Sequence, residues 1–249
     1  MVLLGASAVF FGVIGLAWHD ADTWQSLSAL WKLPSGRIVG DVLMVAQIAA
    51  GLALLLPRSR RVASIVLCVV YALFSLACIP GIIAAPRSFG QYDGFFEQFC
   101  LFCGALAVYA AAEANGSRSL LLGRVARVGL GVSVISFTLA QIVYPHETAA
   151  LVPKWIPPGQ MFWAVLTTVA FALAAIAILI DRKARLAMHL ATLMLVLFGV
   201  LVWIPLLVAH PETHLNWSEF ALTLLIAGAA WTVADPRGTS MPRVAASLR

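Results

Sequence analysis

Two cysteines with the spacing of a redox pair, Cys100 and Cys103, lie in an apolar segment. Residues three apart share one side of a helix, and Cys78 ends the preceding apolar segment, so it could approach them. An oxidising compartment would permit exchange between thiols and disulfides there. The alternative is that these side chains only fill space between helices, because Glu97 one turn away disfavours a reactive thiolate. Thiol chemistry is therefore one hypothesis and packing is the other.

Three acidic residues, Asp41, Glu97 and Glu219, lie near the ends of apolar segments. A charge at the middle of a bilayer costs ~2.5–3.5 kcal/mol even on the lenient insertion scale, and much less near the interface. The first turn of a helix also favours an anion. The three carboxylates are therefore either wetted helix ends or a polar vestibule that takes up protons, a cationic ligand or a quinone.

A tryptophan, a histidine and an aspartate follow one another at Trp18, His19 and Asp20. An imidazole beside a carboxylate could relay protons or help to bind a metal, but adjacent residues on a helix do not face each other. Two further histidines, His210 and His214, are four residues apart, and a proline between them argues against a regular helix. We predict no metal site and expect these groups to be solvated at the membrane interface.

Two loops carry a tryptophan three residues before a proline, at Trp31 and at Trp155. Tryptophan prefers the headgroup layer of a membrane, which is sufficient to explain both as anchors. Alternatively, the two loops could form a lid over a cavity. Lys154 would then suit an anionic headgroup or the carbonyl oxygen of a quinone.

Eight long apolar segments must position these residues. The chain has 249 residues, of which 62% are apolar and 11% are charged, whereas soluble domains average about a quarter charged. Each segment is near the ~20 residues that a helix needs to cross a bilayer. We therefore predict an all-α, polytopic transmembrane fold. The segments cover approximately Val2–Trp18, Val39–Leu56, Val62–Ile83, Phe95–Ala112, Val125–Tyr144, Gln160–Ile180, Leu186–Ala209 and Ser218–Ala234.

The basic residues predict the orientation of these segments, because loops rich in Lys and Arg stay in the cytoplasm. Twelve of the 16 basic residues fall on one side of the predicted topology. They are Arg58, Arg60, Arg61, Arg118, Arg124, Arg127, Arg182, Lys183, Arg185, Arg237, Arg243 and Arg249. Both termini are therefore expected in the cytoplasm. The same bias explains the pI of about 9.3 without any nucleic-acid partner.

The two halves of the chain resemble each other. A shift of 124 residues places Trp31 on Trp155 and Arg58 on Arg182. Each half then has four segments, so both halves have the same orientation, related by an axis along the membrane normal. We predict two tandem four-helix bundles, with units at residues 1–113 and 125–235, a cytoplasmic linker at 114–124 and a cytoplasmic tail at 236–249.

Four stretches resemble the DoxX-like family of bacterial membrane proteins. They are Gly15–Asp20, Phe95–Gln98, Val152–Trp163 and Asn216–Glu219. The resemblance covers nearly the whole chain as two DoxX-like units and implies four transmembrane helices per unit in a bacterial inner membrane. Some members of that family are linked to quinone-coupled sulfur oxidation or to the assembly of redox enzymes. The resemblance assigns no catalytic residue.

Three hypotheses for function follow. The first is an accessory or quinone-associated component of redox or envelope chemistry at the outer face, with no assignable reaction. The second is a thiol-disulfide oxidoreductase that uses Cys100 and Cys103. The third is a small-molecule transporter with a site between the halves, which would depend on Glu97 or Glu219.

Overall fold

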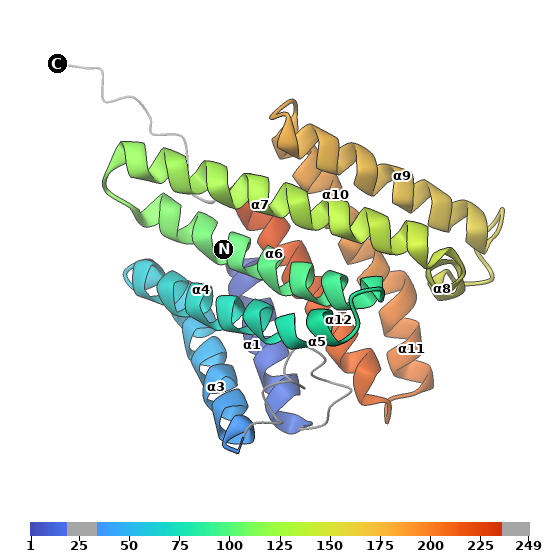
Figure 1. Ribbon diagram of the computed structural model, residues 1–249, viewed down its shortest axis with the longest axis horizontal. Coiled ribbons are helices and arrows are strands. Elements are labelled where there is room, and N and C mark those ends of the chain that lie inside the picture. Colours follow the sequence, from blue (N-terminus) through green and yellow to red (C-terminus); the bar gives the residue numbers. More distant parts are fainter. Residues whose placement is uncertain (19–33, 236–249) are drawn as a thin grey trace.

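The computed structural model describes residues 1–18 and 34–235, and these residues form helices and no strands (Figure 1). The long helices are α1 (Val2–Ala17), α3 (Gly36–Leu54), α4 (Arg60–Ala77), α6 (Phe89–Ala112), α7 (Gly116–Val143), α9 (Gln160–Leu179), α10 (Ala184–Phe198) and α12 (His214–Ala234). The shorter elements are α5 (Ile79–Ala84), α8 (Pro145–Leu151), a π-helix (Gly199–Trp203) and α11 (Ile204–Ala209).

Seven helical segments of the described chain are long and apolar enough to cross a membrane. They are α3, α4 with α5, α6, α7, α9, α10 through α11, and α12. Their apolar side chains are widely exposed to the surroundings, which only lipid can solvate at this scale. The chain is therefore a multi-pass integral membrane protein. Helix α1 coincides with the first predicted segment, but its 16 residues extend only about 24 Å at 1.5 Å per residue.

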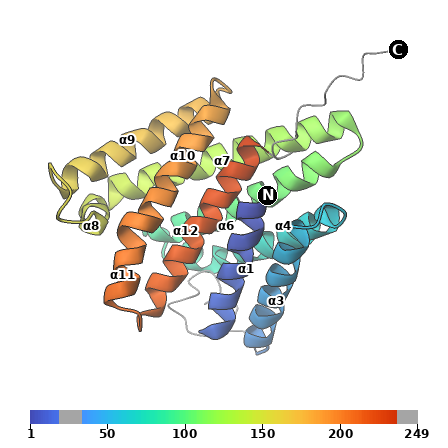
Figure 2. The same ribbon diagram turned by 180° about the vertical axis from the view of Figure 1, so that it is seen from behind.

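The long helices form two layers. Helices α4, α6, α7 and α9 pack side by side in one layer, which faces the reader in Figure 1. Helices α3, α1, α12 and α10 form the other layer, which faces the reader in Figure 2. The layers are joined at their edges by α3 against α4 and by α9 against α10, and at their centre by α6 against α12.

Small residues allow the helices at the centre to approach closely. A Cβ atom added to Gly104 of α6 would lie 2.6 Å from the Cβ of Ala229 in α12. A Cβ added to Gly228 of α12 would lie 2.9 Å from the Cα of Leu4 in α1. Van der Waals packing of such small residues is the main source of helix association in lipid. Helix α12 therefore binds both α1 and α6, and the two halves share one packed centre.

The described ends of the chain lie together with three inter-helical loops. Loops 55–59, 113–115 and 180–183 lie at the end of the helices where Met1 and Asp235 also lie, which we name the basic end. The opposite end carries loops 85–88, 144–159 and 210–213 and is named the acidic end. The described chain therefore begins and ends at the same end of the helices, and the number of membrane crossings stays a prediction.

Three segments differ from their predicted form. Helix α7 begins at Gly116 and not near Val125, so most of the linker predicted at 114–124 is helical. Helix α6 begins at Phe89, not near Phe95, so Glu97 lies about 12 Å beyond its start instead of in its first turn. The segment predicted at Leu186–Ala209 is interrupted by the π-helix, next to Pro205. Proline has no N–H to donate to the carbonyl four residues earlier, so the regular hydrogen-bond ladder cannot continue there.

Candidate functional site

A cavity of about 330 Å³ opens among α6, α7, α9, α10 and α12 at the acidic end. Pockets of roughly this size and upward, lined mainly by apolar side chains with a few polar groups, are typical small-molecule sites. Its lining consists of Asp93, Glu97, Phe137, Ala140, Gln141, Tyr144, Thr148, Leu151, Val152, Pro153, Ile156, Trp163, Thr167, Phe171, Leu195, Phe198, Leu201, Val202, Trp203, Thr223 and Ile226.

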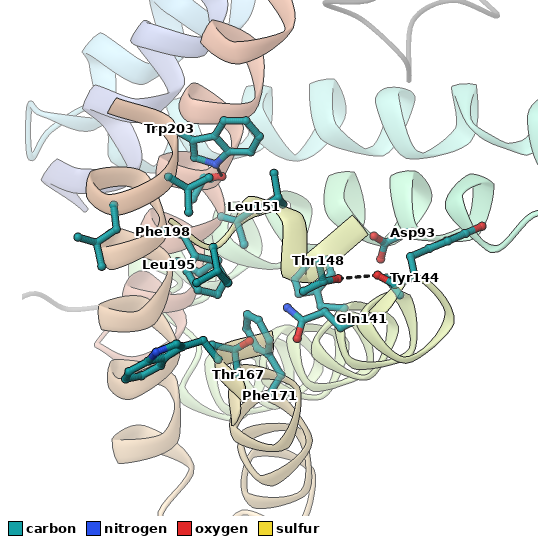
Figure 3. A pocket seen from close by; sticks show the side chains of 18 of the residues that line it. Asp93, Gln141, Tyr144, Thr148, Leu151, Thr167, Phe171, Leu195, Phe198 and Trp203 are labelled. Atoms are coloured by element: carbon teal, nitrogen blue, oxygen red, sulfur yellow. Dashed lines mark hydrogen bonds between the residues drawn. The ribbon is translucent and has the colours of Figure 1, made fainter. Parts of the chain in front are cut away.

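Three of the polar groups, those of Asp93, Gln141 and Thr148, lie together on one side of the cavity in Figure 3. Ser136 of α7 donates a hydrogen bond to Asp93 Oδ1 at 3.1 Å. The backbone N–H of Gly90 donates to the hydroxyl oxygen of Tyr144 at 3.3 Å. These two bonds join the start of α6 to the end of α7 and hold the polar wall in place.

Gln141 and Tyr144 can each offer a donor to a ligand. Thr168 donates to Gln141 Oε1 at 2.8 Å, which leaves the amide nitrogen of Gln141 unengaged among the described residues. The Tyr144 hydroxyl accepts from Gly90, so its own hydrogen remains available. Gln141 lies in the last turn of α7, and Tyr144 is the residue that directly follows this helix.

The opposite wall of the cavity is aromatic and aliphatic. The ring of Phe171 makes edge-to-face contacts with Phe137 at 6.2 Å and with Phe198 at 6.4 Å between centroids. Leu195 extends the same wall in Figure 3. Such a surface suits a flat ring compound, because aromatic rings pack well at these separations.

The π-helix brings one more polar group to the cavity. Leu201, Val202 and Trp203 line the space, and the indole N–H of Trp203 donates to Thr223 Oγ1 of α12 at 3.0 Å. Short π-helices are frequent at functional sites. Here the extra residue in the turn, beside Pro205, directs consecutive side chains toward one space.

The loop between α8 and α9 covers the rim of the cavity through Val152, Pro153 and Ile156. Two hydrogen bonds from α9 hold this loop, from Gln160 Nε2 to Val152 O at 2.6 Å and from the indole of Trp163 to Pro157 O at 2.9 Å. The loop therefore borders the cavity with Val152, Pro153 and Ile156.

The two residues of this loop that were predicted as candidates from the sequence, Lys154 and Trp155, lie outside the cavity. Lys154 is exposed, and Trp155 is 72% exposed. Neither lines the cavity, so a role for Lys154 against a ligand stays a prediction. Both side chains face outward, as membrane anchors do.

Two carboxylates, those of Asp93 and Glu97, line the cavity, and Glu219 interacts with them without lining it. Glu97 and Asp93 are one turn apart on α6, and Glu219 of α12 interacts electrostatically with both. Of these three, Glu97 and Glu219 were predicted as candidates and Asp93 was not. No Lys, Arg or His lines the cavity, and in the described chain no ion pair engages these acids. The acidic end therefore concentrates negative charge beside an apolar space.

The other predicted candidates lie apart from the cavity. Asp41 is half-buried in α3. Trp18 stacks on His214 at 4.7 Å between centroids. His19, Asp20 and Trp31 lie outside the described residues.

The cysteine pair is buried. Cys100 is 0% and Cys103 1% exposed, and all four cysteines are free thiols. A Cβ added to Gly129 of α7 would lie 2.5 Å from Cys103 Sγ, so this thiol is tightly packed between helices.

Sequence reasoning missed most of the polar lining, including Gln141, Thr167 and Thr223. One signal could have indicated them, because a polar side chain inside an apolar segment commonly faces the protein interior. The sequence does not show which interior face each one shares.

Among the described residues, no group of three or more His, Cys, Asp or Glu side chains could hold a metal ion. No known protein family, curated protein or solved structure matches this chain. The chain is an all-α, multi-pass integral membrane protein. Near one end of its helices it has a cavity with acidic residues and an aromatic wall.

Proposed function

We propose that the cavity binds a lipid-soluble ring compound of the quinone class. The protein would then be an accessory component of redox or envelope chemistry at the outer face of a bacterial inner membrane. The observation that carries this proposal is the division of the cavity into an aromatic wall around Phe171 and Phe198 and a polar wall around Gln141 and Tyr144. A quinone has the matching parts, an apolar ring and two carbonyl oxygens.

The donors of the polar wall fit a quinone carbonyl. The amide of Gln141 would donate to one carbonyl oxygen, the hydroxyl of Tyr144 would serve as a separate donor at the edge of the cavity, and the ring would lie against Phe171. A donor aimed at a carbonyl in a water-poor site gives both affinity and orientation. The apolar tail of a quinone would extend toward the lipid that surrounds the helices.

The proposal includes two tandem DoxX-like units that cross the membrane eight times, with the basic end in the cytoplasm. The packing order supports it, because α1, α3, α4 and α6 follow one another as α7, α9, α10 and α12 do. The contact of α6 with α7 also has a counterpart in that of α12 with α1. Reporter fusions at both termini test the orientation, and a terminus found on the outer side would contradict it.

Quinone binding is tested with the full chain purified in mild detergent. Organic extraction should recover quinone, and titration with a short-chain quinone should saturate. Replacing Tyr144→Phe or Gln141→Leu removes one donor each and should weaken binding about fivefold to tenfold. Tyr92→Phe is the matched control, because the Tyr92 hydroxyl donates to Pro86 O and does not line the cavity. An absence of both extracted quinone and saturable binding would overturn the proposal.

The carboxylates favour a second candidate, a transporter of lipophilic cations with its site between the halves. Helix α6 comes from the first half, while α7, α9, α10 and α12 come from the second. Aromatic rings and unpaired carboxylates together attract an apolar cation. Uptake of tetraphenylphosphonium into vesicles should then fall in Glu97→Gln and Glu219→Gln but not in Glu212→Gln, an exposed acid at the same end. Unchanged uptake in the first two variants would eliminate this candidate.

Thiol-disulfide exchange at Cys100 and Cys103 stays a third proposal. Because both thiols are buried, exchange would require α6 to move away from its neighbours. Mass spectrometry with and without reductant decides it: two reduced cysteines, replaceable by alanine without loss of function, would end this reading.

A further inference from the structure

A second hollow lies at the basic end, remote from the acidic-end cavity. This cleft of about 370 Å³ is lined by Met1, by Pro57 and three arginines, and by one side of α6. The arginines are Arg58, Arg60 and Arg61, and the α6 residues are Val108, Ala111 and Ala112. The lining contains no acidic residue. The cleft therefore combines concentrated positive charge with an apolar wall.

The ion pairs of the described chain at the basic end involve only one of the three arginines that line the cleft, Arg61. Glu113 lies 3.5 Å from Arg61, Asp181 lies 3.1 Å from Arg127, and Asp235 lies 3.6 Å from Arg185. Each of the three acids at this end thus already has an arginine.

Arg58 and Arg60 have no carboxylate partner among residues 1–18 and 34–235. The Arg60 side chain is oriented by a hydrogen bond from its Nε to Leu54 O at 3.4 Å. Its terminal amino groups remain for a ligand.

The backbone adds further donors at the same place. Helix α4 begins at Arg60, and no side-chain hydrogen bond caps its N-terminus. The first N–H groups of a helix have no partner within the helix, and the helix dipole places partial positive charge there. The guanidinium groups of Arg58 and Arg60, which have no carboxylate partner in the described chain, and the N-terminus of α4 therefore border the same cleft.

We infer that this cleft binds a phosphate group. Guanidinium groups bind phosphate oxygens through two parallel hydrogen bonds, which gives both strength and geometry. The apolar wall formed by Val108 and Ala111 would receive the carbon atoms next to the phosphate. The phosphate comes either from the headgroup of an anionic phospholipid, whose chains run along the helices, or from a free phosphate in solution.

Basic loops fix the orientation of a membrane protein even when they bind no ligand. The test and control variants must therefore remove the same number of positive charges. The test variant is Arg58→Gln with Arg60→Gln. The matched control is Arg182→Gln with Lys183→Gln, which removes the same charge from the other basic loop. Arg58→Gln alone serves as a second variant, because Arg58 is exposed and makes no hydrogen bond or ion pair with the described residues, so its loss leaves the fold intact.

In the first arm, the full chain is exchanged into detergent with equal phosphatidylglycerol and phosphatidylcholine, and bound lipid is counted by native mass spectrometry. In the second arm, delipidated protein is titrated with inorganic phosphate. We expect the test variant to lose binding about tenfold in at least one arm and the control to keep it, since two charge-assisted contacts are removed. Loss in the first arm alone assigns the site to a lipid headgroup, and loss in the second alone assigns it to free phosphate.

Equal binding by wild type, test variant and control in both arms would overturn the inference. The same conclusion would follow if the test variant and the control lost binding equally, because general positive charge would then explain the result. Should the double variant fail to fold, Arg58→Gln decides alone, with an expected loss of severalfold.

Discussion

Gly104 and Ala229 meet at the centre of the protein, where a Cβ on Gly104 would lie 2.6 Å from the Cβ of Ala229 and 2.8 Å from its Cα. No side chain separates the two backbones at this point. The contact joins α6 of the first half to α12 of the second. It therefore sets the spacing of the two helices that carry Glu97 and Glu219.

Gly104→Ala should destabilise the protein by about 1–3 kcal/mol, the usual cost of forcing an extra carbon into a packed core. The backbone of Ala229 blocks the new methyl group, so a side-chain rotation cannot relieve the clash. Unfolding monitored by circular dichroism in detergent measures the effect. Gly123→Ala is the control, because a Cβ there meets open space and alanine favours a helix by up to ~1 kcal/mol. Equal stability of the two variants would contradict the close contact.

Gln160→Leu should loosen the loop that covers the cavity. The substitution removes the 2.6 Å hydrogen bond to Val152 O, a loss of about 1 kcal/mol, or roughly a fivefold rise in the open population. Trypsin cleavage after the exposed Lys154 reports that opening. Met161→Leu, which changes an exposed neighbour, should leave the rate unchanged. Cleavage at the wild-type rate in Gln160→Leu would show that the bond does not hold the loop.

Glu113 should make stability depend on pH below about 4.3, the ordinary pKa of glutamate. The backbone N–H of Asn115 donates to its carboxylate, and Arg61 adds a favourable charge, so the pKa of Glu113 is lowered. A lowered pKa gives stability that is fully present above the unfolded pKa and is lost as the pH falls through the folded pKa.

The thermal midpoint of the wild type should therefore exceed that of Glu113→Gln at pH 6, and the gap should close as the pH falls below about 4. Arg61→Gln should lower the midpoint at pH 6 by a smaller amount, because the hydrogen bond from Asn115 remains. A gap that stays constant down to pH 3 would mean that Glu113 titrates as a free side chain.

The cysteines should differ in reactivity. Cys68 and Cys78 are half-buried, whereas Cys100 and Cys103 are buried. A small membrane-permeant maleimide should therefore modify the first two in the folded protein and all four after unfolding in dodecyl sulfate. Peptide mass spectrometry identifies the modified residues. Rapid labelling of Cys100 or Cys103 without unfolding would show that α6 opens, and would strengthen the thiol-disulfide proposal.

Apolar length was sufficient to predict the helical segments. The eight predicted segments overlap described helices, and seven of these helical segments are long and apolar enough to cross a membrane. Such features are local, since ~20 apolar residues need lipid whatever surrounds them. The start of α6 was predicted too late because Gln91, Tyr92 and Asp93 reduce the apolar signal of its first turns, although they remain helical.

The cavity could not be predicted in the same way. Glu97 was a candidate from its charge alone, but its neighbours come from four other helices that are distant in sequence. Lys154 and Trp155 were predicted either as membrane anchors or as part of a lid, and three other residues of their loop line the cavity. Which side chains of that loop turn inward depends on the bonds from Gln160 and Trp163, which no local pattern reveals.

The sequence by itself determined that this chain is a set of apolar helices that require lipid, with its basic groups at one end. Each of those properties follows from the transfer of single segments or single charges between water and hydrocarbon. Only the tertiary structure decided that α6 and α12 lie together at the centre, that Asp93 joins Glu97 beside an aromatic wall, and that Cys100 is closed off. Those outcomes depend on small residues that allow two helices to pack closely. Whether two helices pack depends on the residues of both, and the sequence of one segment does not reveal it.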